Sequence, residues 1–248
     1  MPAFRTTALA IATLIATQAC AKESQTEKPV ETKTADGQLS ASISGDSADK
    51  RGVALVRVVN ASSTSKDLQV RADDQRMFPA VKFKGVSAYT PIDQTWATFQ
   101  VGDSSGSAYA PLSTNRELLT DGHRYTLVVL RSEDGTGYET KVIKDAIETE
   151  TGKARLRVIH AAPGAGEVQV YQRSGEKIFG DVDYGDEDGF KSLAPWTGML
   201  DIKSKDNKTT LFTTPAMTLE AGKSYTVVVT RTAKGKVDGF WFEDSQVP

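Results

Sequence analysis

The sequence predicts an all-β protein, built as two tandem immunoglobulin-like antiparallel β-sandwiches that follow a disordered tether. The first observation is an internal repeat, because the segment 52–61 returns as 152–161 and later segments repeat in the same register. The second is that each copy divides into short segments of alternating polarity separated by turn residues, which is typical of such sandwiches. No segment of the repeated body shows a convincing helical period.

The chain begins with a segment typical of a secretory signal peptide, residues 1–19. Arg5 is its one charge, and a stretch of apolar and small residues over 8–16 follows. That stretch is too short to cross a bilayer as a helix, which takes about 20 residues. We therefore expect an exported protein.

The only cysteine of the chain, Cys20, follows this signal directly. The segment Thr17-Gln18-Ala19-Cys20 resembles the lipobox of bacterial lipoproteins, in which the cysteine is acylated and becomes the first mature residue. The alternative is signal-peptide cleavage after Ala21, which would discard Cys20. Because a free thiol at a secreted amino terminus has little other use, we expect Cys20 to be lipidated and to anchor the chain to the cell envelope. The following Ala21 favours the outer membrane, by resemblance to Gram-negative lipoproteins.

The segment from Cys20 to Arg51 differs sharply in composition from the rest of the chain. After the cysteine it is rich in Ser, Thr, Glu, Lys and Ala and contains no aromatic residue. Such a segment buries too little apolar surface to offset the entropy lost on ordering. We therefore interpret residues 20–51 as the lipidated cysteine and a disordered tether.

The repeated body is interpreted as two homologous domains, residues 52–146 and 152–248. Each copy carries the spacing Leu-x-x-Gly-x-x-Tyr, ending at Tyr125 in one copy and at Tyr225 in the other. This spacing resembles the tyrosine corner of immunoglobulin-like sandwiches, in which the phenol hydroxyl bonds to the backbone of the preceding turn. In the first copy we expect strands over 53–60, 67–72, 77–84, 95–101, 107–112, 124–131 and 138–144.

The segment Ala154–Pro163, with the sequence ARLRVIHAAP, is similar to the opening motif of a bacterial family known as domain of unknown function 4397. The later segments 168–171 and 219–228 resemble the rest of that family's signature. The first copy departs from the motif, with Asn60 and Ser63 where the family has histidine and proline, which indicates a diverged duplicate. The resemblance implies an exported, envelope-associated sandwich protein and brings no established activity.

Composition excludes several classes of function. The 248 residues carry 30 basic and 32 acidic side chains, so no basic footprint for nucleic acid is present. One cysteine rules out an internal disulfide framework, and two histidines make a histidine-rich metal centre implausible. No nucleophile elbow, phosphate-binding loop or dinucleotide fingerprint occurs. We therefore expect no catalytic residue, no cofactor and no enzymatic activity.

Both histidines are better explained by structure than by chemistry. His160 closes a predicted strand, and we expect it to bond the turn that follows, residues 161–163. His123 is interpreted as a solvated turn residue. The acidic, glycine-rich segment 181–189 is a weak calcium candidate, because Ca²⁺ prefers carboxylate oxygens; its carboxylates are Asp181, Asp183, Asp186 and Asp188.

Aromatic side chains provide a further candidate surface. In the last predicted strand, Phe240 and Phe242 should face one way and Trp241 the other, with one of the two sides in the core. Trp96 and Trp196 stand in repeat register, so we expect core packing for both. Any aromatic ring left exposed would suit stacking on a sugar or a protein partner.

These observations favour a non-enzymatic cell-envelope lipoprotein that acts as an interaction or structural module. The alternative is a carbohydrate-binding module that docks on cell-wall or extracellular glycan. The expected partners are thus a membrane, reached through the lipid on Cys20, and an unknown envelope protein or glycan.

Overall fold

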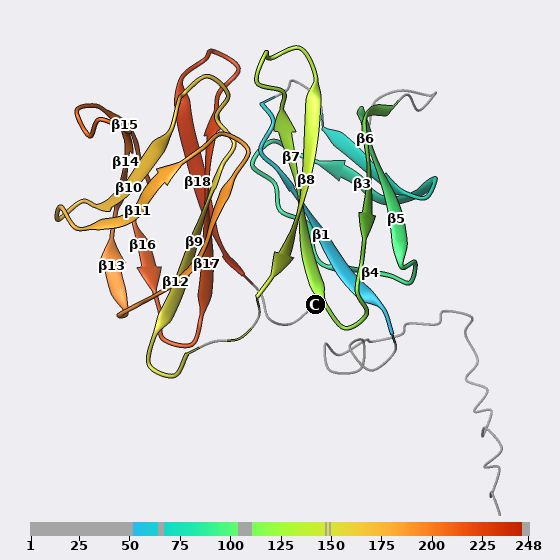
Figure 1. Ribbon diagram of the computed structural model, residues 1–248, viewed down its shortest axis with the longest axis horizontal. Coiled ribbons are helices and arrows are strands. Elements are labelled where there is room, and N and C mark those ends of the chain that lie inside the picture. The colour runs from blue at the N-terminus through green and yellow to red at the C-terminus, as the bar shows by residue number, and fades with distance from the viewer. Residues whose placement is uncertain (1–51, 64–66, 104–110, 147, 149, 245–248) are drawn as a thin grey trace, which may run out of the picture. The chain divides into compact units, whose positions relative to one another are not determined.

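The computed structural model describes residues 52–63, 67–103, 111–146, 148 and 150–244. The predicted signal segment 1–19, Cys20 and the tether of 20–51 lie outside the described residues. Every regular element in the described residues is a strand (Figure 1). These residues contain no helix long and apolar enough to cross a membrane. The strands are β1 (Ala54–Asn60), β2 (Leu68–Ala72), β3 (Gln75–Val81), β4 (Thr90–Ile92), β5 (Trp96–Asp103), β6 (Pro111–Leu118), β7 (Arg124–Arg131), β8 (Tyr138–Asp145), β9 (Ala154–His160), β10 (Val168–Gln172), β11 (Lys177–Val182), β12 (Glu187–Leu193), β13 (Trp196–Gly198), β14 (Leu200–Ser204), β15 (Thr210–Thr213), β16 (Met217–Leu219), β17 (Ser224–Arg231) and β18 (Val237–Asp244).

The strands form β-sandwiches, which confirms the predicted fold class. In the first half, β1–β8, the sheet β4-β1-β7-β8 packs on the sheet β3-β2-β5-β6. In the second half, β9–β18, the sheet β12-β9-β17-β18 packs on β11-β10-β14-β15 and on the small sheet β13-β16. Each half has its own core, which includes the fully buried Phe99 in the first and Phe179 in the second.

Both tyrosine corners are present as predicted. The hydroxyl of Tyr125 accepts a hydrogen bond from the backbone N–H of Thr120 at 3.0 Å, and that of Tyr225 accepts one from Glu220 at 3.2 Å. Gly122 takes a φ of 72° in the first of these turns, a conformation that costs glycine little. The motif therefore fixes the entry into β7 and, in the same way, into β17.

The expectation of purely antiparallel sheets is wrong at one pairing in each half. β1 runs parallel to β7, and β9 runs parallel to β17. The chain leaves β1, crosses to the other sheet and returns before it forms β7, so these neighbours need not be antiparallel. An alternating pattern shows which face is buried but contains no information on strand direction.

Two strand predictions in the first half also need correction. β4 was not predicted, because it is three residues long and contains Pro91, which is tolerated here at the edge of its sheet. β6 spans Pro111–Leu118, whereas the pattern predicted 107–112, and residues 107–110 lie outside the described ranges. A strand at an edge has weak alternation, and this makes its bounds hard to read from sequence.

A third apolar cluster joins the two halves. It brings side chains of β1, β7 and β8 together with Ile159, Ala161 and Val228 of the second half. Phe240 and Phe242 of β18 pack against it, and their rings stack at a centroid distance of 6.3 Å. The sheets β4-β1-β7-β8 and β12-β9-β17-β18 are therefore covered on both faces, which explains why β1 and β7 are buried almost without alternation.

Candidate functional site

Two buried arginines lie between the halves at equivalent places of the repeat. Arg57 is in the middle of β1 and Arg157 in the middle of β9, and their exposed fractions are 2% and 1%. Each points away from the core of its own half, on the strand face opposite Val56 and Val58 or their counterparts. A buried guanidinium is costly unless it is paired and hydrogen-bonded, so its partners define the centre of this contact.

Arg157 binds an aspartate of the first half. Its Nη2 donates to Oδ1 of Asp145 at 2.6 Å and also lies 3.3 Å from Oδ1 of Asp244. Its Nε donates to the hydroxyl of Thr226 at 2.8 Å. That hydroxyl in turn donates to Oδ2 of Asp244 at 2.7 Å. The threonine therefore bridges the arginine and an aspartate of the same half by hydrogen bonds.

Arg57 repeats this arrangement with the halves exchanged. Its Nη2 donates to Asp244 of the second half, and its Nε donates to the hydroxyl of Thr126 at 2.9 Å. Thr126 donates to Asp145 at 2.7 Å. Each arginine therefore pairs with the aspartate of the other half, and we call these six residues the crossed ion-pair network: Arg57, Thr126, Asp145, Arg157, Thr226 and Asp244.

Aromatic rings cover both guanidinium groups. The Arg57 guanidinium carbon lies 4.8 Å from the ring centre of Tyr89, and that of Arg157 lies 4.7 Å from the ring centre of Phe190. These rings occupy equivalent places beside β1 and β9 and exclude water from the charges. The Tyr89 hydroxyl also donates to Asp145 at 2.8 Å. Burial, and then the charge of Asp145, raises the pKa of Tyr89 above its usual value.

The electrostatic balance keeps the Arg157 guanidinium charged. Burial alone lowers the pKa of Arg157, but Asp145 and then Asp244 outweigh it, so the pKa rises above its ordinary value. Glu187 lies 3.7 Å from Nη1 of Arg157, and burial raises the pKa of this glutamate despite the nearby arginine. The centre of the contact is therefore a compact set of compensated charges around a guanidinium that stays ionised at neutral pH.

Three of the four carboxylates of the calcium candidate have separate partners. Asp181 accepts from Gln169 at 2.5 Å, and Asp188 pairs with Lys191 at 3.1 Å. Asp186 pairs with Lys141 of the first half at 2.8 Å, so this segment contributes to the contact between the halves. For Asp183, the backbone carbonyl oxygen, and not the carboxylate, accepts a hydrogen bond from the backbone N–H of Asp186 at 3.1 Å. Among the described residues, no three carboxylate, histidine or cysteine side chains are grouped to hold a metal ion.

His160 has the structural role expected from the sequence. Its Nδ1 accepts from the backbone N–H of Ala162 at 3.3 Å, and its Nε2 lies 2.8 Å from the carbonyl oxygen of Gly166. Asn60 replaces it in the first half, where its side chain accepts from the N–H of Ser62 and donates to the carbonyl of Val81. His123 lies in its turn, 3.0 Å from the carbonyl of Asp121. Both ring nitrogens of His160 are thus used by the backbone.

We expect folding stability to depend on His160 below neutral pH. Burial lowers the pKa of this histidine from its ordinary value of 6.5, so the folded chain holds it neutral while the unfolded chain takes up a proton. Stability is therefore fully present above about pH 6.5 and falls as the pH drops from there to the folded pKa. His160→Asn, the residue of the first half, should flatten this slope, as urea unfolding from pH 8 to pH 5 would show. An equally steep slope in the variant would contradict the assignment.

Trp96 and Trp196, which stand in repeat register, have different surroundings in the two halves. Trp196 packs against the core of the second half, as predicted. Trp96 does not pack in the core, since 52% of its surface is exposed. Trp96 precedes the buried Phe99 by three residues, whereas Trp196 precedes the buried Leu200 by four. Because successive strand residues alternate between faces, the missing residue turns Trp96 outward.

The residues paired with Trp96 and Trp196 on the adjacent strands show the same change of register. Trp196 is paired with the buried Leu219, and Trp96 with Leu118, which is 50% exposed. Trp241 packs against the core of the second half beside Tyr225, while Phe240 and Phe242 pack between the halves, as the alternation predicted. Trp96 is therefore the exposed tryptophan of the described chain.

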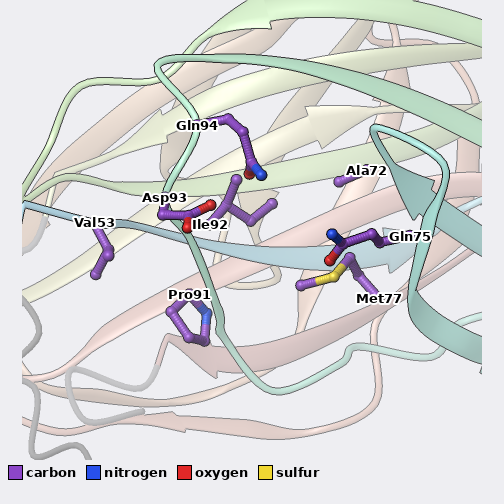
Figure 2. A pocket seen from close by; sticks show the side chains of 8 residues that line it. All are labelled: Val53, Ala72, Gln75, Met77, Pro91, Ile92, Asp93 and Gln94. Atoms are coloured by element: carbon purple, nitrogen blue, oxygen red, sulfur yellow. The ribbon is translucent and has the colours of Figure 1, made fainter.

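A cleft opens at one end of the first half, between the edge strands β3 and β4 (Figure 2). Its volume is about 360 Å³, within the usual range of ligand pockets. Ala72, Met77 and Ile92 form its apolar part, and Gln75 faces the segment that carries Asp93 and Gln94. Trp96 follows two residues later, so its Cα lies at most about 7 Å from that of Gln94.

Comparisons with known proteins give one family match and several structural resemblances of low score. The family model described as Domain of unknown function (DUF4397) matches residues 54–171, which is the first half and the start of the second. No curated protein matches the chain.

Three solved structures resemble the chain at low similarity. The Bacillus anthracis TIE protein is 12% identical with a TM-score of 0.23; 72% of this chain is covered, and the chain spans about a third of that protein, 34%. CBMbc, a family CBM26 module from Eubacterium rectale Amy13K solved in complex with maltoheptaose, is 12% identical with a TM-score of 0.23, covering 77% of this chain and 97% of that one. A streptococcal virulence factor, described as binding alpha-glucan, is 8% identical with a TM-score of 0.24. The match covers 70% of this chain and 91% of that one. These low values support no inference about function.

Proposed function

We propose that the chain is a non-enzymatic cell-envelope lipoprotein whose folded body acts as an interaction or structural module. The observation that carries this proposal is the crossed ion-pair network, which joins the two halves through Arg57–Asp244 and Arg157–Asp145. A binding surface held in one arrangement loses less entropy when a partner docks than a surface on two loosely linked domains. The body is thus suited to present a fixed surface away from a membrane.

The charges and the histidine of this region support a structural use rather than a catalytic one. Both ring nitrogens of His160 are engaged by the backbone. The buried carboxylates Asp145 and Asp244 accept from threonine and arginine groups of the network. We also propose that both halves are copies of the domain whose family model matches residues 54–171.

The lipid anchor provides the direct test of the envelope assignment. We expect the mature chain to begin at Cys20, to carry acyl groups there and to sediment with membranes. Cys20→Ser should block processing and leave an unacylated precursor, as intact-mass spectrometry would show. Thr17→Leu, which brings the segment closer to the usual lipobox, should be processed and acylated normally. A mature chain that begins at Lys22 without lipid would overturn the assignment.

A carbohydrate-binding module is the second candidate function. The observation that favours it is Trp96, an aromatic ring that is half exposed on the face of a β-sheet and that follows Gln94, a residue on the polar rim of a cleft, by two residues. In this case the two-sandwich body would hold a glycan rather than a protein partner.

A further inference from the structure

Trp96 and Leu118 form a small apolar patch on the outward face of the sheet β3-β2-β5-β6. The two residues are directly opposite each other on β5 and β6, and about half of each is exposed. The guanidinium carbon of Arg116, on the same face, lies 5.1 Å from the Trp96 ring centre. The equivalent tryptophan of the second half, Trp196, packs against the core, so the half-exposed ring of Trp96 is a feature of one half and not of the repeat. The two adjacent side chains offer an apolar surface that a ligand of suitable shape can contact.

The neighbouring cleft has the chemistry of a site for an uncharged, hydrogen-bonding ligand. Its inner surface is apolar, and its rim carries two primary amides, Gln75 and Gln94, and one carboxylate, Asp93. These three side chains are exposed, and together they offer both hydrogen-bond donors and acceptors. None of the eight lining residues is basic, so the cleft provides no counter-charge for a phosphate, sulfate or uronate group.

A sugar ring matches both parts of this surface. The C–H groups of one pyranose face are apolar and carry slight positive charge, which suits stacking on the negative face of an indole ring. Hydroxyl groups on the ring edge both donate and accept, as amides and a carboxylate require. A lipid tail would not use the polar groups of the rim. An anionic ligand in the cleft would face Asp93 with no basic side chain among the lining residues, since Arg116 lies on Trp96 and not in the cleft.

We propose that Trp96 and the cleft lined by Gln75, Asp93 and Gln94 bind an uncharged glycan. This inference deepens the second candidate function and places its site in the first half. The sugar ring stacks on Trp96, and the next ring of the oligosaccharide reaches the cleft, where the two amides and the carboxylate bind its hydroxyls.

Calorimetric titration with defined oligosaccharides tests this proposal. The probes are maltoheptaose, cellohexaose and chitohexaose, which are uncharged, and hexagalacturonate, which is anionic. We expect saturable binding of at least one uncharged probe and none of hexagalacturonate. Trp96→Ala should weaken that binding at least about tenfold, and Trp96→Phe should keep part of it. Asp93→Ala and Gln94→Ala should weaken it as well, because each removes one hydrogen-bonding group from the rim.

Met199→Ala is the matched control, because Met199 is an exposed apolar residue of the second half, 37% exposed, and takes no part in the site. It should bind as the wild type does, and all variants should unfold at the same temperature. Binding of hexagalacturonate alone, no binding of an uncharged probe at millimolar concentration, or full affinity in Trp96→Ala would each overturn the proposal. None of these results touches the lipid on Cys20, so the envelope assignment is tested separately.

Discussion

Arg157→Ala is expected to lower the free energy of unfolding by about 3–5 kcal/mol. The substitution leaves Asp145 without its 2.6 Å partner and removes a second cation from Asp244, and both carboxylates stay buried between the halves. Asp145 keeps the hydroxyls of Thr126 and Tyr89, but the Arg57 guanidinium lies farther from it, at 3.8 Å. A buried charge that loses its closest partner costs far more than the net value of the pair. Guanidinium chloride unfolding, followed by tryptophan fluorescence and by circular dichroism, measures the change.

The matched control for this prediction is Arg155→Ala. Arg155 lies on the same strand and the same face, but its Nη1 donates to exposed carbonyl oxygens of Ala146 and Glu148. Its loss should cost about 1 kcal/mol. The double variant Arg157→Ala, Asp145→Ala should cost less than the sum of the two single variants, because the buried carboxylate that lost its closest cation is also removed. Equal effects for Arg155→Ala and Arg157→Ala would show that the network does not hold the halves together.

Val228→Asp is expected to separate the two halves while each keeps its own core. Val228 is fully buried in the apolar cluster between the halves and contributes to neither of the two separate cores. A carboxylate there has no partner, and its burial is costly enough that the contact opens instead. Differential scanning calorimetry should show one cooperative transition in the wild-type body and two in the variant. Small-angle scattering should show a larger radius of gyration.

Leu112→Asp tests whether an added charge alone produces this effect. Leu112 is 46% exposed on β6, so an aspartate there remains solvated. We expect a single transition and an unchanged radius of gyration for this control. If Val228→Asp also unfolds in one transition at unchanged size, the apolar cluster contributes little to the contact between the halves.

The sandwich architecture could be predicted because its signals are local and occur twice. The repeat register, the strand alternation around Val56 and its counterpart Leu156, and the corners at Tyr125 and Tyr225 each depend on nearby residues. The role of His160 was predicted for the same reason, since its partners follow within six residues.

The contact between the halves was not predicted, although its residues stand in the repeat. Arg57 and Arg157 alternate with core residues and so resemble solvent-facing side chains, and only the opposite half shows that they are buried. Their partners are harder to find, because Asp145 and Asp244 are 99 residues apart rather than 100. For Trp96 a sequence signal did exist. Trp96 precedes the core residue Phe99 by three positions, an odd number, and an odd spacing along a strand places the two side chains on opposite faces.

The crossed ion-pair network is self-complementary, because each half supplies one arginine, one threonine and one aspartate. A protein with a single such half would carry both members of the pair and could bind a second copy of itself about a twofold axis, as isologous dimers do. The short connection between β8 and β9 makes that encounter intramolecular and raises the effective concentration of each half for the other. This chain therefore contains, within one polypeptide, the association that a single-half relative would achieve as a homodimer.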